Sequence, residues 1–374
     1  MSKEDLFLKR FVANITAKKL PNEALKQLVF GQQNFCLQQF FINKHGQSHT
    51  IPLPLFPHYL FLMNNLDNPY TDTNNPYDEY LQSSWAYQYM KGHSPNRKYC
   101  NTKENRKERI REFVRLYESI AERKYLGEKV FKLPIKVCRR PDGRLIIVSG
   151  NHRASIALKL GIDIRMNFIN PHKHLRNIVE VPEEFYGTKR KNMPYQSVFD
   201  GETHLVKGRR PDVLERIRML DEKDLQNKSI LDLGCNIGSN CYLAVQFGAR
   251  CAVGIDCSPQ LINAAVKLNS YFALPCIFAV HDLNRELNGI EPADTVFCFS
   301  LVSHLKDRSE LVQTILKKTK SILYFEGHQN TKQNDYDYLL NRDYFSSIEL
   351  LGYTRDGIHN EKKTRPLFRC TIAK

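Results

Sequence analysis

Short apolar runs alternate with amphipathic stretches along the C-terminal half of the chain. Runs of this length predict buried strands, and they occupy residues 229–232, 251–256, 275–282, 294–301 and 321–326. Between them, apolar positions three and four residues apart predict helices, for example over 259–270 and 310–319. Strands that alternate with helices are typical of an α/β domain built on a parallel sheet.

The N-terminal half predicts a helical extension, a mixed-charge helix over 103–124, and then a compact α+β pattern. Strands over 133–137 and 144–148 are joined by a turn, and a helix over 154–160 and a strand over 162–168 follow. Residues 171–194 contain three prolines and a basic run, which predicts a linker. We therefore expect an α+β domain over 1–170, a linker over 171–194 and an α/β domain over 195–374.

The most informative stretch is 229–240, Ser-Ile-Leu-Asp-Leu-Gly-Cys-Asn-Ile-Gly-Ser-Asn, which predicts a strand, a glycine turn and the start of a helix. Gly234 and Gly238 have no Cβ, so a ligand can approach the backbone and a positive φ costs little. A dinucleotide fingerprint starting at Gly234 would place glycine where Asn236 and Ser239 stand. An acidic-x-Gly-x-Gly-x-Gly pattern from Asp232 fails only at Asn236. This loop resembles motif I of the class I S-adenosylmethionine (SAM) methyltransferases.

That resemblance implies a Rossmann-like sheet with SAM bound beyond the ends of its strands. Asp256, 24 residues after Asp232, is expected to accept hydrogen bonds from the ribose hydroxyls. The resemblance assigns the adenine amino group to Asp282, with Leu283 beside the ring. The expected cofactor-binding residues are Asp232, Gly234, Cys235, Asn236, Gly238, Asp256, Cys257, Asp282, Leu283 and Phe299. A phosphate-binding Gly-x-x-x-x-Gly-Lys loop, which would indicate a triphosphate, is missing from the motif.

Methyl transfer is an in-line displacement in which positioning supplies most of the catalysis. A hydroxyl acceptor also benefits from a general base near the ends of the fourth and fifth predicted strands. His304 is our first candidate for that base, with Glu326 and His328 behind it. The signatures of base N-methylation and of cytosine C5 methylation do not follow the fourth strand, which disfavours those DNA enzymes.

A second resemblance lies in the N-terminal half. The run from strand through Gly150-Asn151-His152-Arg153 into a helix resembles the ParB/sulfiredoxin-like superfamily, which implies binding of nucleotide phosphate by this loop. The helix N-terminus, His152 and Arg153 could converge on one anion. Sulfiredoxins have a catalytic cysteine where Asn151 stands, so sulfinate reduction is not expected. A purely structural His-Arg pair is the alternative. We expect substrate or phosphate contacts from Gly150, Asn151, His152 and Arg153.

A lead-in segment over 195–228 precedes motif I, and its Gly-Arg-Arg turn also occurs before motif I in several SAM methyltransferases. There it caps the cofactor site, so Arg209 could contact the carboxylate of SAM or an anionic substrate. A plain salt bridge is an equal alternative for Arg209.

Composition narrows the cellular setting and the partners. The formal net charge of +15 is concentrated in residues 1–180, which contain 29 basic and 16 acidic residues, so this half could face a phosphate, an acidic glycan or RNA. No run of about 18 apolar residues predicts a membrane span, and the N-terminus has no signal-peptide pattern. Ten scattered cysteines without a Cys-x-x-Cys pair disfavour a metal site and favour a reduced, cytoplasmic setting.

Three functions remain open. The first is a SAM-dependent methyltransferase that O-methylates a glycan or a small, possibly phosphorylated metabolite, with a nucleotide- or phosphate-binding N-terminal domain. The second is an RNA methyltransferase with the basic half as its RNA platform. The third is a methyltransferase whose N-terminal half is a non-catalytic interaction or sensing module.

Overall fold

The computed structural model describes residues 18–31, 35–45, 50–70, 75–90, 102–122, 134–179, 193–301, 308–327, 344–355 and 364–373. The chain divides into two compact units, Met1–His174 and Leu175–Lys374. The division falls inside helix α8 (Pro171–Val179), so the segment predicted as a linker begins as a helix. Its continuation, residues 180–192, lies outside the described residues.

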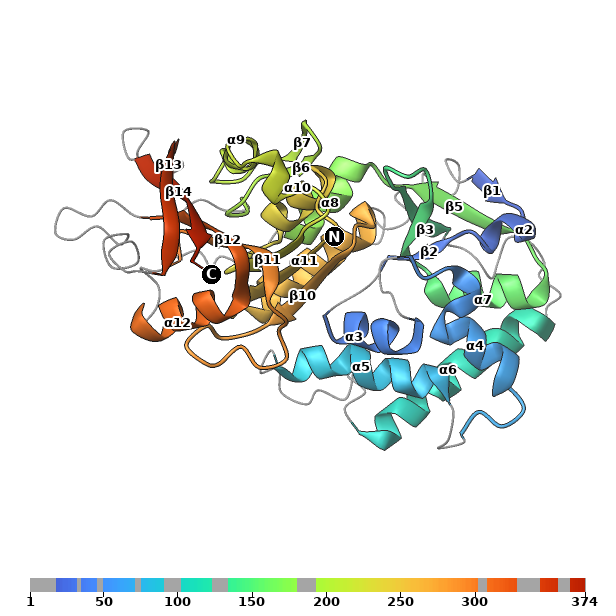
Figure 1. The fold of residues 1–374 in the computed structure, drawn as a ribbon. Coiled ribbons are helices and arrows are strands. Elements are labelled where there is room, and N and C mark those ends of the chain that lie inside the picture. Colours follow the sequence, from blue (N-terminus) through green and yellow to red (C-terminus); the bar gives the residue numbers. More distant parts are fainter. Residues whose placement is uncertain are drawn as a thin grey trace. The chain divides into compact units, whose positions relative to one another are not determined.

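Seven described strands of the C-terminal unit form one sheet in the order β10-β9-β8-β11-β12-β14-β13 (Figure 1). They are β8 (Ser229–Leu233), β9 (Cys251–Asp256), β10 (Cys276–Val280), β11 (Ala293–Phe299), β12 (Thr319–Glu326), β13 (Phe345–Arg355) and β14 (Thr364–Ile372). The first five are parallel, whereas β14 is antiparallel to its neighbours β12 and β13. The chain runs outward from β8 through β9 to β10 and returns on the other side of β8 with β11. Ligands bind at the carboxyl ends of the strands at such a switch point.

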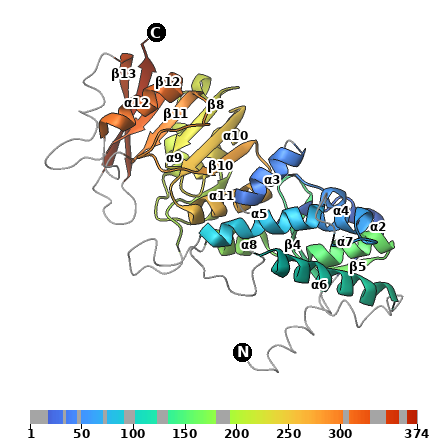
Figure 2. The ribbon, with the colours of Figure 1, turned by 90° about the horizontal axis from the view of Figure 1, so that it is seen from below.

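The five parallel strands confirm the prediction from the apolar runs. Helices α10 (Ser239–Gln246) and α11 (Pro259–Phe272) pack on one face (Figure 2). There the Tyr242 ring contacts the rings of Phe272 and Phe278. Helix α12 (Arg308–Lys318) packs on the opposite face through Val312 and Ile315. Both faces of the parallel part of the sheet are therefore covered, which is why its strands read as apolar runs rather than as alternating patterns.

Ahead of this sheet, the lead-in segment forms a small hairpin of β6 (Val198–Asp200) and β7 (Thr203–Val206) and the short helix α9 (Val213–Arg218). Helix α9 packs against α10. The lead-in thereby supplies side chains to the region beside the motif I loop.

The N-terminal unit has a mixed sheet in the order β1-β5-β3-β4-β2. The strands of this sheet are β1 (Lys18–Leu20), β2 (Val29–Phe30), β3 (Ile135–Arg139), β4 (Leu145–Ser149) and β5 (Ile164–Phe168). The described helices of the unit are α2 (Asn22–Leu25), α3 (Phe35–His45), α4 (Pro57–Asn64), α5 (Pro76–Met90), α6 (Lys103–Glu122) and α7 (Asn151–Leu160). A 3₁₀ turn lies at Leu53–Leu55. The predicted hairpin, helix and strand correspond to β3, β4, α7 and β5, with bounds shifted by up to three residues. None of the described helices of either unit has the length and apolar character needed to cross a membrane.

Candidate active site

A cavity of about 450 Å³ opens at the carboxyl ends of the central strands of the C-terminal sheet. Its walls come from the motif I loop, the ends of β9 and β11, the start of α11 and the lead-in segment. The lining residues are Tyr195, Gln196, Arg210, Arg216, Gly234, Asn236, Asn240, Asp256, Cys257, Ser258, Leu261, Phe299, Ser300 and Leu301. The cavity therefore lies where the strand order reverses.

The motif I loop turns through three left-handed residues, Gly234, Asn236 and Gly238, with φ of +72°, +56° and +81°. A Cβ on Gly238 would lie 2.6 Å from the Phe278 ring, so this position needs glycine for space as well as for conformation. Asparagine is the side chain that best tolerates the left-handed region, which explains how Asn236 replaces the middle glycine of the motif.

Asp256, at the end of β9, faces this cavity. One carboxylate oxygen accepts from the Asn236 amide at 3.0 Å and the other from the Ser258 amide at 2.9 Å. Burial raises the pKa of Asp256, and these two hydrogen bonds oppose the rise. The carboxylate is thus fixed to the glycine turn, with oxygen lone pairs left for a ligand.

Asp232 has a different position from the one we expected. Its side chain is 1% exposed and is not part of the cavity wall, and its carboxylate accepts from the Asn240 side chain at 3.3 Å. Burial raises the pKa of Asp232 to about 7, against the opposing effects of Asn240 and Arg216. Asp232 therefore lies behind the cavity wall, where it accepts a hydrogen bond from Asn240, a residue that does line the cavity.

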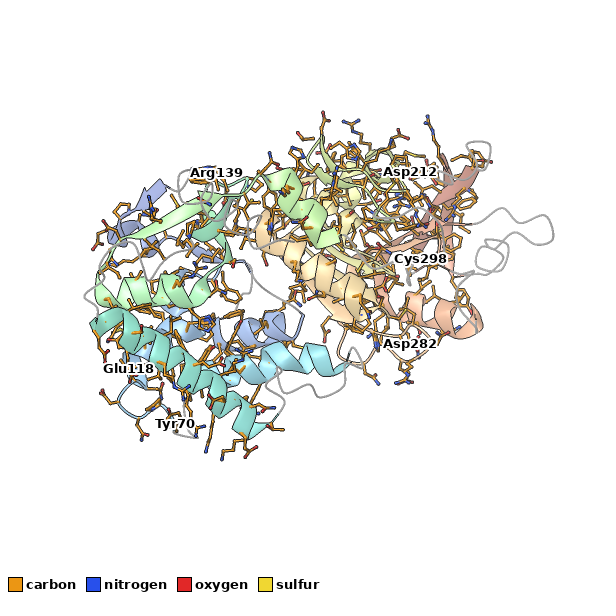
Figure 3. The ribbon with its side chains drawn as sticks, turned by 180° about the vertical axis from the view of Figure 1, so that it is seen from behind. Tyr70, Glu118, Arg139, Asp212, Asp282 and Cys298 are labelled. Carbon is orange, nitrogen blue, oxygen red and sulfur yellow. The ribbon has the colours of Figure 1, made fainter. Side chains whose placement is uncertain are left out.

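Asp282 and Leu283 are also absent from the described cavity wall. Asp282 lies on the loop after β10 with 45% of its side chain exposed, and its carboxylate accepts from the amide and side chain of Asn284 (Figure 3). Leu283 is buried in the core beneath the sheet. The described geometry does not bring the carboxylates of Asp232, Asp256 and Asp282 into one wall, and only Asp256 lines the cavity.

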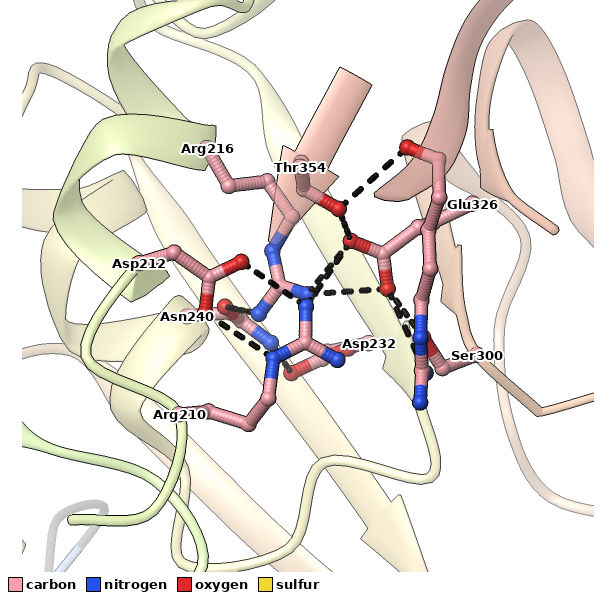
Figure 4. A network of polar contacts seen from close by, with 9 residues as sticks. Arg210, Asp212, Arg216, Asp232, Asn240, Ser300, Glu326 and Thr354 are labelled. Atoms are coloured by element: carbon pink, nitrogen blue, oxygen red, sulfur yellow. Dashed lines mark hydrogen bonds and ion pairs between the residues drawn. The ribbon is translucent and has the colours of Figure 1, made fainter. Parts of the chain in front are cut away.

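A buried network centred on Glu326 (Figure 4) reaches the cavity wall through Arg210, Arg216 and Ser300. Arg216 donates to both Glu326 oxygens at 3.1 and 3.2 Å, and Arg210 donates at 3.1 Å. The hydroxyls of Ser300 and Thr354 donate to the same carboxylate, and an Arg365 nitrogen lies 3.9 Å away. Glu326 is fully buried and joins β12 to the lead-in, α9, β11, β13 and β14.

Two further contacts fix the arginines. Arg210 donates two hydrogen bonds of 2.9 Å to Asp212, and Arg216 donates to Asn240 at 3.0 Å while its guanidinium stacks 4.5 Å from the Phe299 ring centre. The network contains three guanidiniums, those of Arg210, Arg216 and Arg365, and, with Asp232 behind Asn240, three carboxylates, those of Asp212, Asp232 and Glu326. Arg210 and Arg216 line the cavity, so their guanidiniums can meet an anionic ligand group there.

The contacts of Glu326 determine whether it can act as the general base predicted from the sequence. Burial alone would raise the pKa of Glu326, but Arg216 and Arg210 outweigh burial and hold that pKa well below its usual range. Such a carboxylate is a poor proton acceptor, so the arrangement argues against Glu326 as a general base and fits a structural role. His304 and His328 lie outside the described residues.

Some cavity residues were missed from the sequence. Arg210, not its neighbour Arg209, lines the cavity; Arg209 is 8% exposed and lies outside the wall. Arg216 and Asn240 were not expected either. Both are buried on helices, and a polar or charged side chain buried at a helix position needs a hydrogen-bond partner, which is the signal that could have found them.

The predicted anion loop of the N-terminal unit is built as expected at Gly150, which has φ of +112° and precedes α7. His152, however, points into the core, where its Nε2 lies 2.6 Å from the Tyr77 hydroxyl. Burial and the charges of Arg109 and Arg153 lower the pKa of His152 to about 4, so the ring is neutral near pH 7. A contact from His152 to an anion near pH 7 would therefore be a hydrogen bond from a neutral ring and not an ion pair. Asn151 is 3% exposed.

Comparison with known proteins agrees with the C-terminal geometry. Residues 205–350 match the family model described as a methyltransferase domain. The ribosomal protein L11 methyltransferase of Pasteurella multocida is 31% identical over 113 residues, 29% of this chain and 37% of that protein. Its counterpart in Hamiltonella defensa is 41% identical over 58 residues, 16% of this chain and 19% of that protein. The chain thus spans well under half the length of these curated relatives.

Among solved structures, magnesium protoporphyrin IX methyltransferase from Synechocystis PCC 6803 with bound S-adenosylhomocysteine (SAH) is similar at 17% identity and a TM-score of 0.36. The match covers 43% of this chain and 82% of that one. The glycine turn, the Asp256 carboxylate and the family match together identify a SAM-dependent methyltransferase domain in the C-terminal unit.

Proposed function

We propose that the C-terminal unit binds SAM in the cavity described above and transfers its methyl group to a hydroxyl of a glycan or a small metabolite. The observation that carries this proposal is the polarity of the cavity. The fixed carboxylate of Asp256 and the guanidiniums of Arg210 and Arg216 line the same cavity. SAM carries a ribose diol, which suits a carboxylate, and a terminal methionine carboxylate, which suits a guanidinium.

The residues at the wall fit this cofactor. Asp256 would accept from the ribose hydroxyls, the backbone of Gly234 would lie along the middle of the molecule, and Arg210 and Arg216 would face the methionine carboxylate. Two buried atoms of the wall, Nε of Arg216 and Oδ1 of Asn236, have no hydrogen-bond partner among the described residues. A polar ligand commonly completes such a wall. When bound, SAM supplies an electrophilic methyl group on a sulfonium.

The chain's own contribution to methyl transfer is then positioning and proton removal. His304 follows the cavity residue Leu301 by three positions, and His328 follows Glu326 by two, so both are proposed as the base for a hydroxyl acceptor. Ser300 lines the cavity, but its hydroxyl donates to Glu326 and is committed to the buried network.

For the N-terminal unit, the proposed phosphate contact narrows to the start of α7 and Arg153, because the ring of His152 is neutral. Burial lowers the pKa of Arg153, which is consistent with a guanidinium held inside the fold. A non-catalytic sensing module remains the alternative. Binding of nucleotides to the full chain, compared between the wild type and Arg153→Gln, separates the two, because only a phosphate site loses affinity.

The acceptor is tested by offering the full chain radiolabelled SAM with hydroxylated monosaccharides, their phosphates, and RNA. The proposal expects label on sugar or sugar phosphate, with loss of transfer in His304→Ala or His328→Ala. Transfer to RNA alone, weakened steeply by salt, would replace the proposal with the RNA methyltransferase.

A further inference from the structure

A second cavity, of about 290 Å³, lies within the N-terminal unit between helices α5, α6 and α7. Its lining is mainly apolar and aromatic, with Tyr77, Tyr80 and Leu81 from α5 and Phe113 and Leu116 from α6. Tyr77 and Phe113 are each only 2% exposed, and the rings of Tyr77 and Tyr80 are nearly parallel at 12° with centres 5.9 Å apart. This apolar and aromatic lining favours a hydrocarbon ring over a polar or charged group.

The inner end of this cavity is polar but uncharged. His152 lines it and is hydrogen bonded to the Tyr77 hydroxyl at 2.6 Å. The His152 ring meets Phe113 edge to face at 4.7 Å and meets the fully buried His58 at 4.6 Å. Because burial keeps both imidazoles neutral, this end can hydrogen bond a neutral polar group but cannot attract an ion.

The outer end has one charge of each sign. Arg109 and Glu112 line the cavity, and their side chains form an ion pair of 2.6 Å while remaining 36% and 52% exposed. An exposed pair of this kind contributes little to stability. It does offer a guanidinium for a carboxylate and a carboxylate for an ammonium within a short distance of each other.

We propose that this cavity binds a free aromatic amino acid, with its ring against the apolar and aromatic lining, its α-carboxylate at Arg109 and its α-ammonium at Glu112. The size of the cavity suits one ring, since it lies at the lower limit of small-ligand sites. The paired charges of the outer end match a zwitterion and not a simple acid or amine. The Tyr77–His152 pair places a hydrogen-bonding group where the para position of the ring would lie, so tyrosine should bind more tightly than phenylalanine.

The test is calorimetric titration of the full chain with L-tyrosine and L-phenylalanine. Three analogues each lack one feature: 3-phenylpropionate lacks the ammonium, phenethylamine lacks the carboxylate, and L-cyclohexylalanine lacks the aromatic ring. We expect each analogue to bind at least tenfold more weakly than phenylalanine. Methyl glucoside serves as the probe for a carbohydrate site and should not bind.

Matched variants on α6 locate the site. Arg109→Gln should weaken phenylalanine binding at least tenfold, whereas Arg111→Gln, which removes an arginine paired with Glu108 on the same helix, should leave it unchanged. In the same way, Glu112→Gln should weaken phenylalanine binding, whereas its matched control Glu108→Gln should leave it unchanged. Both arginines are surface residues, so the variants should fold, and unchanged circular dichroism checks this. Equal binding by Arg109→Gln and Arg111→Gln, tighter binding of the glucoside, or no heat with either amino acid at millimolar concentration would overturn the proposal.

Discussion

Replacing Glu326 with glutamine is the perturbation to which the C-terminal unit should be most sensitive. The substitution keeps the shape of the side chain but removes the charge that the buried guanidiniums of Arg210 and Arg216 contact directly. Removing one partner of a buried ion pair typically costs 3–5 kcal/mol, about the Coulomb energy of two charges 4 Å apart at an effective dielectric constant of 20. We therefore expect Glu326→Gln to lower the free energy of unfolding of this unit by about 3–5 kcal/mol.

The measurement is urea unfolding of the full chain, following the transition that added SAH shifts, because a ligand stabilises only the unit that binds it. Glu202→Gln is the matched control, since Glu202 pairs with Arg218 at the surface with 76% of its side chain exposed. That variant should stay within about 0.5 kcal/mol of the wild type. The same small effect for Glu326→Gln would refute the reasoning.

The pH dependence of stability tests independently whether the ion pairs of Glu326 stabilise the fold. The folded-state pKa of Glu326 is held below its ordinary value of 4.5, so the stabilisation is present above pH 4.5 and is lost as the pH falls toward the folded-state pKa. The difference between wild type and Glu326→Gln should therefore shrink below pH 4.5. A difference that grows on acidification would contradict the assigned ion pairs.

Two further substitutions probe the motif I loop and the acid behind it. Asn236→Gly should change the free energy of unfolding by less than about 1 kcal/mol, whereas Asn236→Val, at φ +56°, should lower it by about 1–2 kcal/mol. Asn288→Val, at an exposed site, controls for the change of residue type. Equal effects of Asn236→Val and Asn288→Val would contradict a left-handed Asn236. Because the pKa of Asp232 is raised, the folded chain keeps a proton on this carboxyl between pH 3.8 and about 7, where the unfolded chain has lost it. The contribution of Asp232 to the free energy of unfolding therefore falls as the pH rises through that interval. Asp232→Asn should therefore gain stability over the wild type at pH 8 relative to pH 5, measured by urea unfolding, and a gain confined to pH 5 would refute the assignment.

The central part of the methyltransferase sheet could be predicted from the sequence because its strands are covered on both faces. Burial on both sides makes each strand a continuous apolar run, and the glycine turn marks where the first one ends. Strands β13 and β14 lack that signal. Most of β13 is exposed, with Leu350 and Tyr353 at 47% and 53%, and β14 carries Pro366 between two arginines, so neither gives a periodic pattern.

The site was predicted less well, for a physical reason. Sequence spacing locates residues at strand ends, and it correctly placed Asp256 at the cavity. It does not show which way a side chain turns, so Asp232 and Asp282 were grouped with Asp256 although one is buried behind the wall and the other bonds its own loop. The Glu326 network joins residues more than 100 positions apart, and no local pattern indicates that Arg210 and Arg216 share one carboxylate with Thr354.

The most direct test of the account is calorimetric titration of the full chain with SAH, repeated for Asp256→Ala and Asp282→Ala. The account predicts one binding site, a loss of affinity of at least tenfold in Asp256→Ala, and wild-type affinity in Asp282→Ala. Absence of binding heat in the wild type would contradict it, and so would a loss of affinity confined to Asp282→Ala.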